Sequence, residues 1–179
     1  GISMLAGFGP LAGIVFTLLG LVPLFYLHKK RNTAAAVPAM LTFTALSGLG
    51  LGPTLSHYIN MPGGSGTVLT AAVITTAVTL ALTAYVQRTG KDFSRMGGFL
   101  FAGLIVVILA SIAAMFVPAM QVGVSAVAAL LFSGFILYDT SRLVRGEEDN
   151  YVMAAVSMYL NVLNLFLSVL QLLGFSSND

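Results

Sequence analysis

Residues 150–174 read NYVMAAVSMYLNVLNLFLSVLQLLG, and this stretch predicts how the chain folds. At a rise of 1.5 Å per residue, it is long enough to cross a hydrocarbon core about 30 Å thick. Its polar residues recur at spacings of 4, 3, 4 and 3, which places them on one face of an α-helix. They are Ser157, Asn161, Asn164, Ser168 and Gln171. The sequence therefore predicts a transmembrane helix with one polar stripe.

The stripe constrains where this helix lies. Polar side chains in a membrane face protein or water rather than lipid. We therefore expect the last helix to be central in a bundle, with its stripe turned inward. Two interpretations stay open. The stripe either supplies hydrogen bonds between helices or forms the wall of a polar pathway.

The rest of the chain is equally apolar. Of the 179 residues, 58% are hydrophobic and 8% are charged, whereas a soluble domain has about 25% charged residues. This composition indicates an all-α integral membrane protein that has the lipid bilayer as a partner and binds no nucleic acid. The absence of cysteine excludes thiol catalysis and thiolate metal sites. Five further apolar stretches precede the last one, at Met4–Leu27, Thr33–Tyr58, Thr67–Gln87, Met96–Val117 and Gln121–Leu143.

The basic residues predict the orientation of the chain. All eight lie in three alternate loops, at Lys29, Lys30, Arg31, Arg88, Lys91, Arg95, Arg142 and Arg145. Loops rich in Lys and Arg stay on the cytoplasmic side, so we expect the C-terminus outside. The sequence begins at Gly1 and enters an apolar stretch almost at once. We expect that a further helix is missing upstream, with a cleaved N-terminus as the alternative.

Asp139 is the only acid within an apolar stretch. An ionisable residue in a membrane span is a functional candidate by default. The alternative is an ion pair with Arg142, three residues on, worth a few tenths of a kcal/mol. Asn161 lies about 16 Å into the last helix by helical rise, so a contact with Asp139 is compatible with the spacing.

The sequence predicts no enzyme and no resident cofactor. An aspartyl intramembrane protease needs two carboxylates that share a proton, and only Asp139 lies deep in a predicted helix. A serine protease needs a serine and a histidine at matched depth, and His57 lies at the edge of its stretch without a nucleophile motif beside it.

Several longer segments together resemble the Bax-inhibitor-motif transmembrane family, and within it the bacterial members related to the modulator of the FtsH membrane protease. The resemblance runs across nearly the whole chain. It implies seven helices with the last surrounded by the other six, and hence a single transmembrane domain over residues 1–179 that lacks the first family helix. The segments that carry it are Ser47–Pro53, Ser56–Tyr58, Leu137–Thr140, Ser157–Asn161, Asn164–Phe166 and Leu173–Ser177.

The resemblance implies that the protein is a pH-sensitive calcium leak channel. In such members two aspartates, on the sixth and seventh helices, share a hydrogen bond. The first corresponds to Asp139, which becomes a candidate contact for calcium, and the second falls on Asn161. A family basic residue falls near Lys30 or Arg31. Because an Asp–Asn pair lacks the repulsion between two carboxylates, we expect a weaker pH response, or one shifted to lower pH.

The resemblance also implies an alternative function. Bacterial relatives bind an FtsH-type membrane protease and restrain it, which requires no transport activity. The closer resemblance to bacterial members implies a location in a bacterial inner membrane. Ion flux by the pure protein would favour the channel, and co-purification with the protease would favour the modulator.

Overall fold

The computed structural model describes residue 29 and residues 32–176, and every regular element in this part is helical. Five helical segments are long and apolar enough to cross a membrane, in agreement with five of the predicted stretches. The sixth stretch, Met4–Leu27, lies outside the described residues, as do Lys30 and Arg31. The five segments are Ala36–Ile59, Gly64–Thr89, Ser94–Ala114, Pro118–Val144 and Tyr151–Ser176.

The first of these segments consists of two helices, α3 (Ala36–Gly50) and α4 (Gly52–Ile59), separated by one residue. That residue, Leu51, keeps a right-handed helical backbone, and its N–H lies 3.2 Å from the carbonyl oxygens of Ser47 and Gly48. Pro53 comes directly after the break, in the first turn of α4, where a missing N–H costs little. The break is therefore local and leaves one continuous apolar segment.

The remaining helices are α5 (Gly64–Thr89), α6 (Gly97–Ala114), α7 (Gln121–Val144) and α8 (Tyr151–Ser176). Two short 3-10 turns, η2 (Ser94–Met96) and η3 (Pro118–Met120), come directly before α6 and α7. The described residues form two compact units. One comprises residues 29, 32–68 and 150–156, and the other comprises residues 69–149 and 157–176.

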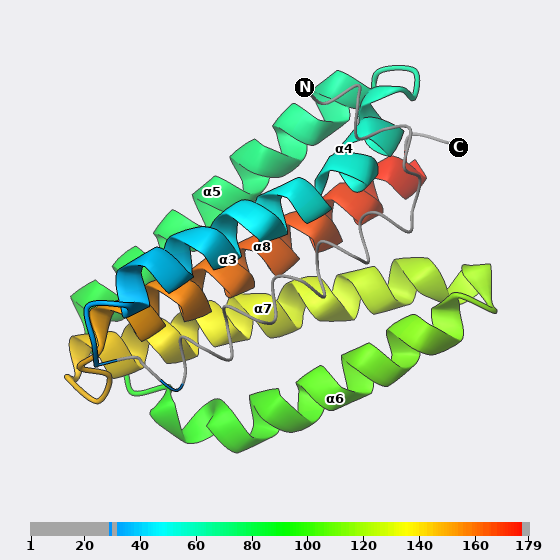
Figure 1. Ribbon diagram of the computed structural model, residues 1–179. Coiled ribbons are helices and arrows are strands. Elements are labelled where there is room, and N and C mark those ends of the chain that lie inside the picture. The colour runs from blue at the N-terminus through cyan, green and yellow to red at the C-terminus, as the bar shows by residue number, and fades with distance from the viewer. Residues whose placement is uncertain (1–28, 30–31, 177–179) are drawn as a thin grey trace. The chain divides into compact units, whose positions relative to one another are not determined.

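In the second unit, α6 and α7 lie side by side and run in opposite directions (Figure 1). Two glycines allow this close packing. A Cβ atom on Gly103 of α6 would lie 2.8 Å from a methyl of Leu131, and one on Gly134 of α7 would lie 2.8 Å from a methyl of Leu100. Each leucine thus fills the space above a glycine on the other helix. Helices in lipid associate through such small residues, because apolar burial alone gives them no advantage.

The outer surface of α6 is strongly apolar. Phe99, Phe101 and Leu109 are 75%, 62% and 61% exposed. A soluble protein rarely exposes so many large apolar side chains on one helix, whereas a lipid environment favours them. This surface agrees with the composition, and both indicate a membrane protein.

Candidate functional site

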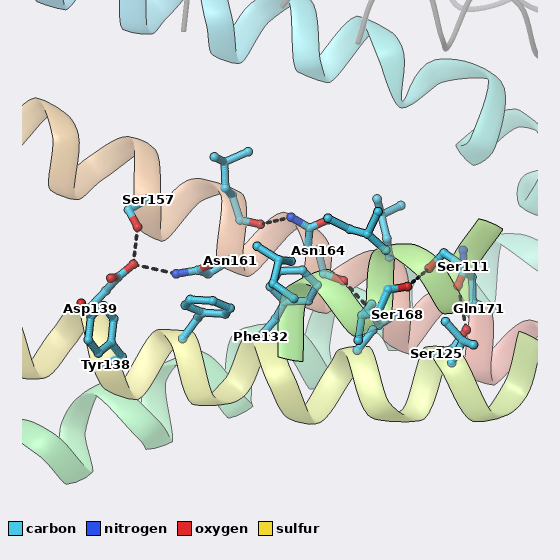
Figure 2. Close-up of a pocket in the computed structure, with 18 of the residues that line it drawn as sticks. Ser111, Ser125, Phe132, Tyr138, Asp139, Ser157, Asn161, Asn164, Ser168 and Gln171 are labelled. Atoms are coloured by element: carbon cyan, nitrogen blue, oxygen red, sulfur yellow. Dashed lines mark hydrogen bonds between the residues drawn. The ribbon is translucent and has the colours of Figure 1, made fainter. Parts of the chain in front are cut away.

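Asp139 lies in the last two turns of α7 and contacts two residues of α8 (Figure 2). The Ser157 hydroxyl donates a hydrogen bond to Oδ2 of Asp139. Nδ2 of Asn161 donates to the same oxygen at 2.7 Å. Because Ser157 and Asn161 are four residues apart on one helix face, both reach a single carboxylate, and Asn161 is only 6% exposed. The spacing had left a contact between Asp139 and Asn161 open, and the structure shows it.

Neutral donors, rather than a cation, hold this acid. Within residues 29 and 32–176, no basic nitrogen lies within 4.0 Å of the Asp139 carboxylate. The guanidinium of Arg142 instead lies 3.5 Å from a carboxylate oxygen of Glu148 and 5.5 Å from the centre of the Tyr138 ring. The ion pair between Asp139 and Arg142, the alternative considered from the sequence, is not formed.

The polar side chains in the middle of the α8 stripe form their hydrogen bonds differently. Nδ2 of Asn164 donates to the carbonyl oxygen of Leu160 at 2.8 Å, and the hydroxyl of Ser168 donates to the carbonyl oxygen of Asn164 at 2.7 Å. Both bonds stay within α8, so each of these side chains has one donor satisfied by the backbone of its own helix.

The far end of the stripe again links two helices. The buried hydroxyl of Ser125 on α7 donates to Oε1 of Gln171 on α8 at 2.7 Å (Figure 2). The sequence analysis did not single out Ser125. The sequence does indicate that Ser125 shares a helix face with Asp139. The two residues are 14 positions apart, a spacing that returns a helix to nearly the same face.

A cavity of about 730 Å³ connects these contacts between α6, α7 and α8. Asp139, Arg142 and all five residues of the stripe line it. The structure thus brings together every predicted site residue that it describes, while Lys30 and Arg31 lie outside the described residues. Apolar side chains of α6 and α7 form much of the remaining lining: Leu104, Val107, Ile108, Ile112, Phe132 and Phe135.

A loop fastens the Asp139 end of α7. Ser141, which is fully buried, accepts a hydrogen bond from the backbone N–H of Phe93 at 3.0 Å. Its hydroxyl donates to the carbonyl oxygen of Lys91 at 3.3 Å. Sequence reasoning also missed this residue, which fixes the loop before α6 to a point two residues beyond Asp139.

Asp92 organises the same loop. Its Oδ1 accepts bonds from the hydroxyl and from the backbone N–H of Ser94, the latter at 2.9 Å. Its Oδ2 lies 3.6 Å from the Arg145 guanidinium. The bonds from Ser94, helped by Arg145 and Arg95, hold the pKa of Asp92 below its ordinary value. The loop thus carries an ionised carboxylate next to a basic residue of the α7 end.

The cavity offers a cation one carboxylate and several neutral oxygens. In residues 29 and 32–176, no group of three His, Cys, Asp or Glu side chains is placed to hold a metal ion. An ion at Asp139 would therefore contact one carboxylate together with hydroxyl, amide or water oxygens, which calcium accepts as ligands. Such a site has few fixed charges, which suits transient contact with an ion rather than permanent binding.

Several apolar helices, three of which line a cavity that contains the partly buried acid Asp139, define a multi-pass α-helical membrane protein. Residues 1–178 match the family model described as Inhibitor of apoptosis-promoting Bax1, and the chain belongs to this Bax inhibitor family.

Three bacterial relatives are similar over most of the chain. An uncharacterized membrane protein of Vibrio cholerae is 45% identical over 99% of the chain and 81% of the relative. The Modulator of FtsH protease YccA of Escherichia coli K12 is 40% identical over 95% of the chain and 78% of the relative. A protein of E. coli O6:H1 with the same identity and coverage is named Inner membrane protein YccA.

Proposed function

We propose that this protein is a pH-sensitive calcium leak channel, or a related cation-permeation protein, in which the cavity between α6, α7 and α8 is part of the path. The observation that carries the proposal is the position of Asp139. Its carboxylate lines the cavity and is held by Ser157 and Asn161. A negative group held by neutral donors is suited to attract a cation into a low-dielectric passage.

The proposal includes the arrangement of the whole protein. Residues 1–179 belong to a single transmembrane domain of the seven-helix type, in which α8 is central and its stripe faces the path. The basic loops are cytoplasmic and the C-terminus is outside. A bacterial inner membrane is the proposed location, supported by the name of the E. coli O6:H1 relative. Lys30 or Arg31 is the proposed basic partner of the acid.

The pH response is proposed to originate at Asp139. Ionised, its carboxylate accepts hydrogen bonds from Ser157 and Asn161, and protonation removes its charge and one of its acceptor positions. The charged groups of α7 and the following loop that act on it are Arg142 and Glu148. A change in pH thus alters both the charge in the cavity and the contact between α7 and α8.

Calcium flux in proteoliposomes tests the proposal. Purified protein is reconstituted, and calcium entry is measured across a range of pH for wild type and for Asp139→Asn. We expect flux in wild type that changes with pH, and a flat pH profile in the variant. Ser133→Ala is the matched control, because within the described residues its hydroxyl bonds to the carbonyl oxygen of Ala129 in its own helix. Absence of flux in wild type and in Asp139→Asn would overturn the proposal.

Asn161→Asp tests the role of the second position. It places a carboxylate within hydrogen-bond distance of Asp139, since the present Nδ2–Oδ2 distance is 2.7 Å. Two carboxylates at that distance titrate as a coupled pair and are protonated at different pH values. We expect a steeper pH response, or one shifted to higher pH, than in wild type. An unchanged profile would contradict the assignment of pH sensing to this pair.

The alternative function is an inhibitory partner of an FtsH-type membrane protease, without transport activity. It is favoured by the E. coli relative named as a modulator of that protease, which is 40% identical over 95% of the chain. Co-purification with the protease, together with slower degradation of a membrane substrate, would support it. This function predicts no effect of Asp139→Asn on calcium entry into liposomes.

A further inference from the structure

Two levels of the cavity lining carry polar contacts between α7 and α8. At one level Asp139 of α7 meets Ser157 and Asn161 of α8, and at the other Ser125 of α7 meets Gln171 of α8. The 14 residues between Ser125 and Asp139 correspond to about 21 Å along a helix. The two contacts therefore mark opposite ends of the polar stripe, as Figure 2 shows.

The two levels are separated by a stretch of different character. Here α7 contributes the apolar side chains of Ala128, Phe132 and Phe135 to the cavity wall. The facing side chains Asn164 and Ser168 donate their bonds to carbonyl oxygens of α8. The Ser125–Gln171 bond thus joins α7 to α8 at the end of the cavity far from the acid.

We propose that the Ser125–Gln171 hydrogen bond is a second, uncharged closure of the path, distinct from the site at Asp139. This inference rests on the proposed cation-permeation function. While the bond is formed, Oε1 of Gln171 is occupied by the Ser125 hydroxyl and the two helices are held together at this level. When it breaks, Oε1 becomes an oxygen ligand for a passing cation, of the amide type that calcium accepts.

The chemistry of the pair suits a closure that opens. Ser125 is 3% exposed, so its hydroxyl needs a partner, yet neither group is charged. Interhelical hydrogen bonds of this kind change an equilibrium between two helix arrangements by about three- to ten-fold. Such a bond keeps the closed arrangement dominant without making the open one inaccessible. Because no charge is involved, this closure does not respond to pH.

The test compares calcium entry into proteoliposomes for Ser125→Ala, Gln171→Ala and the double variant. We expect each single variant to raise flux about three- to ten-fold at every pH, with the pH profile keeping its wild-type shape. Both substitutions remove the same bond, so the double variant should match the single ones. Ser125→Thr keeps the hydroxyl and should return flux toward the wild-type level.

Controls separate closure from loss of fold. Ser133→Ala removes a hydroxyl from the same helix whose bond is to the α7 backbone, and its flux should equal that of wild type. All variants are compared by elution profile and thermal melting in detergent, so a misfolded protein is recognised. If Ser125→Ala is unfolded, Gln171→Ala and Ser125→Thr still decide the question.

The results distinguish this inference from the function on which it rests. A conducting wild type whose flux is unchanged or reduced by both Ser125→Ala and Gln171→Ala would overturn the second closure and leave the channel intact. A gain of flux that occurs at only one pH would overturn its independence from Asp139. A wild type without flux would overturn the proposed function, and this inference with it.

Discussion

The two ends of the contact between α7 and α8 use different chemistry for the same task. At one end a single carboxylate oxygen of Asp139 accepts bonds from Ser157 and Asn161. At the other end one neutral hydroxyl donates to one neutral amide oxygen. Removing a partner from a charged group leaves a larger desolvation cost than removing one from a neutral group. We therefore expect the Asp139 end to hold the two helices together more firmly than the Ser125 end.

The largest effect is expected for Asn161→Leu. It removes one of the two donors to the partly buried Asp139 carboxylate, and loss of a partner by a buried polar group costs about 1–3 kcal/mol, more when the group is charged. Unfolding of the purified protein in detergent micelles, by heat or by SDS titration, measures the loss. Asn164→Leu is the matched control, because Asn164 bonds only to a carbonyl oxygen of its own helix in the described contacts. Equal losses of unfolding free energy in the two variants would show that the bond from Asn161 to Asp139 stabilises the protein no more than a bond within α8.

A smaller loss of unfolding free energy is expected for Ser141→Ala. This residue binds the loop before α6 to the end of α7 that carries Asp139. The substitution leaves the N–H of Phe93 and the carbonyl oxygen of Lys91 without this partner, at a cost of about 1–2 kcal/mol. Hydrogen exchange of the 90–96 segment should rise together with the loss of stability. Unchanged protection of the Phe93 amide would show that Ser141 does not hold the loop.

At the neutral end, Ser125→Ala is expected to cost about 0.6 kcal/mol, the average for interhelical hydrogen bonds in a membrane protein. The same unfolding measurement applies. A loss of unfolding free energy as large as that of Asn161→Leu would contradict this expectation, since the Ser125–Gln171 contact would then stabilise the helix pair as much as the Asp139 contact does.

The smallest effect concerns acid pH and the exposed carboxylate of Asp92. Its pKa is held below the ordinary value of 3.8 by hydrogen bonds from Ser94. A group with a depressed pKa in the folded state contributes stability that is present above its unfolded pKa, and that is lost as pH falls through the folded pKa. Asp92→Asn should therefore be slightly less stable than wild type at neutral pH, and its loss of stability below about pH 4 should be flatter. An unaltered acid limb in the variant would refute this contribution.

Much of the architecture follows from hydropathy. The predicted stretch Gln121–Leu143 and the observed helix Gln121–Val144 differ by one residue, because glycine, proline and charged residues end apolar helices in membranes. The polar stripe of α8 was also predictable, since a spacing of three and four residues fixes a helix face whatever surrounds it. All five of its residues line the cavity.

The partners of these residues were harder to predict. Ser125 and Ser141 are each one hydroxyl in a long apolar helix, and a serine of this kind can equally bond to its own backbone, as Ser133 does. Gly103 and Gly134 do not form a GxxxG pair, so their packing role depends on the register between α6 and α7. Which hydroxyl or glycine meets another helix depends on tertiary packing, which spacing along one helix does not contain.

The reciprocal packing of Leu131 on Gly103 and of Leu100 on Gly134 has a mechanical consequence. For α6 to slide along α7, both leucine side chains would have to leave their gaps at once, so we expect the two helices to move as one body. The cavity has three helical walls, and two of them are thereby coupled. We therefore expect a change in its width to come from a displacement of α8. The hydrogen bonds at the two ends of the polar stripe oppose this displacement. Protonation of Asp139 can weaken the bonds at one end, and a thermal fluctuation can break the single bond at the other.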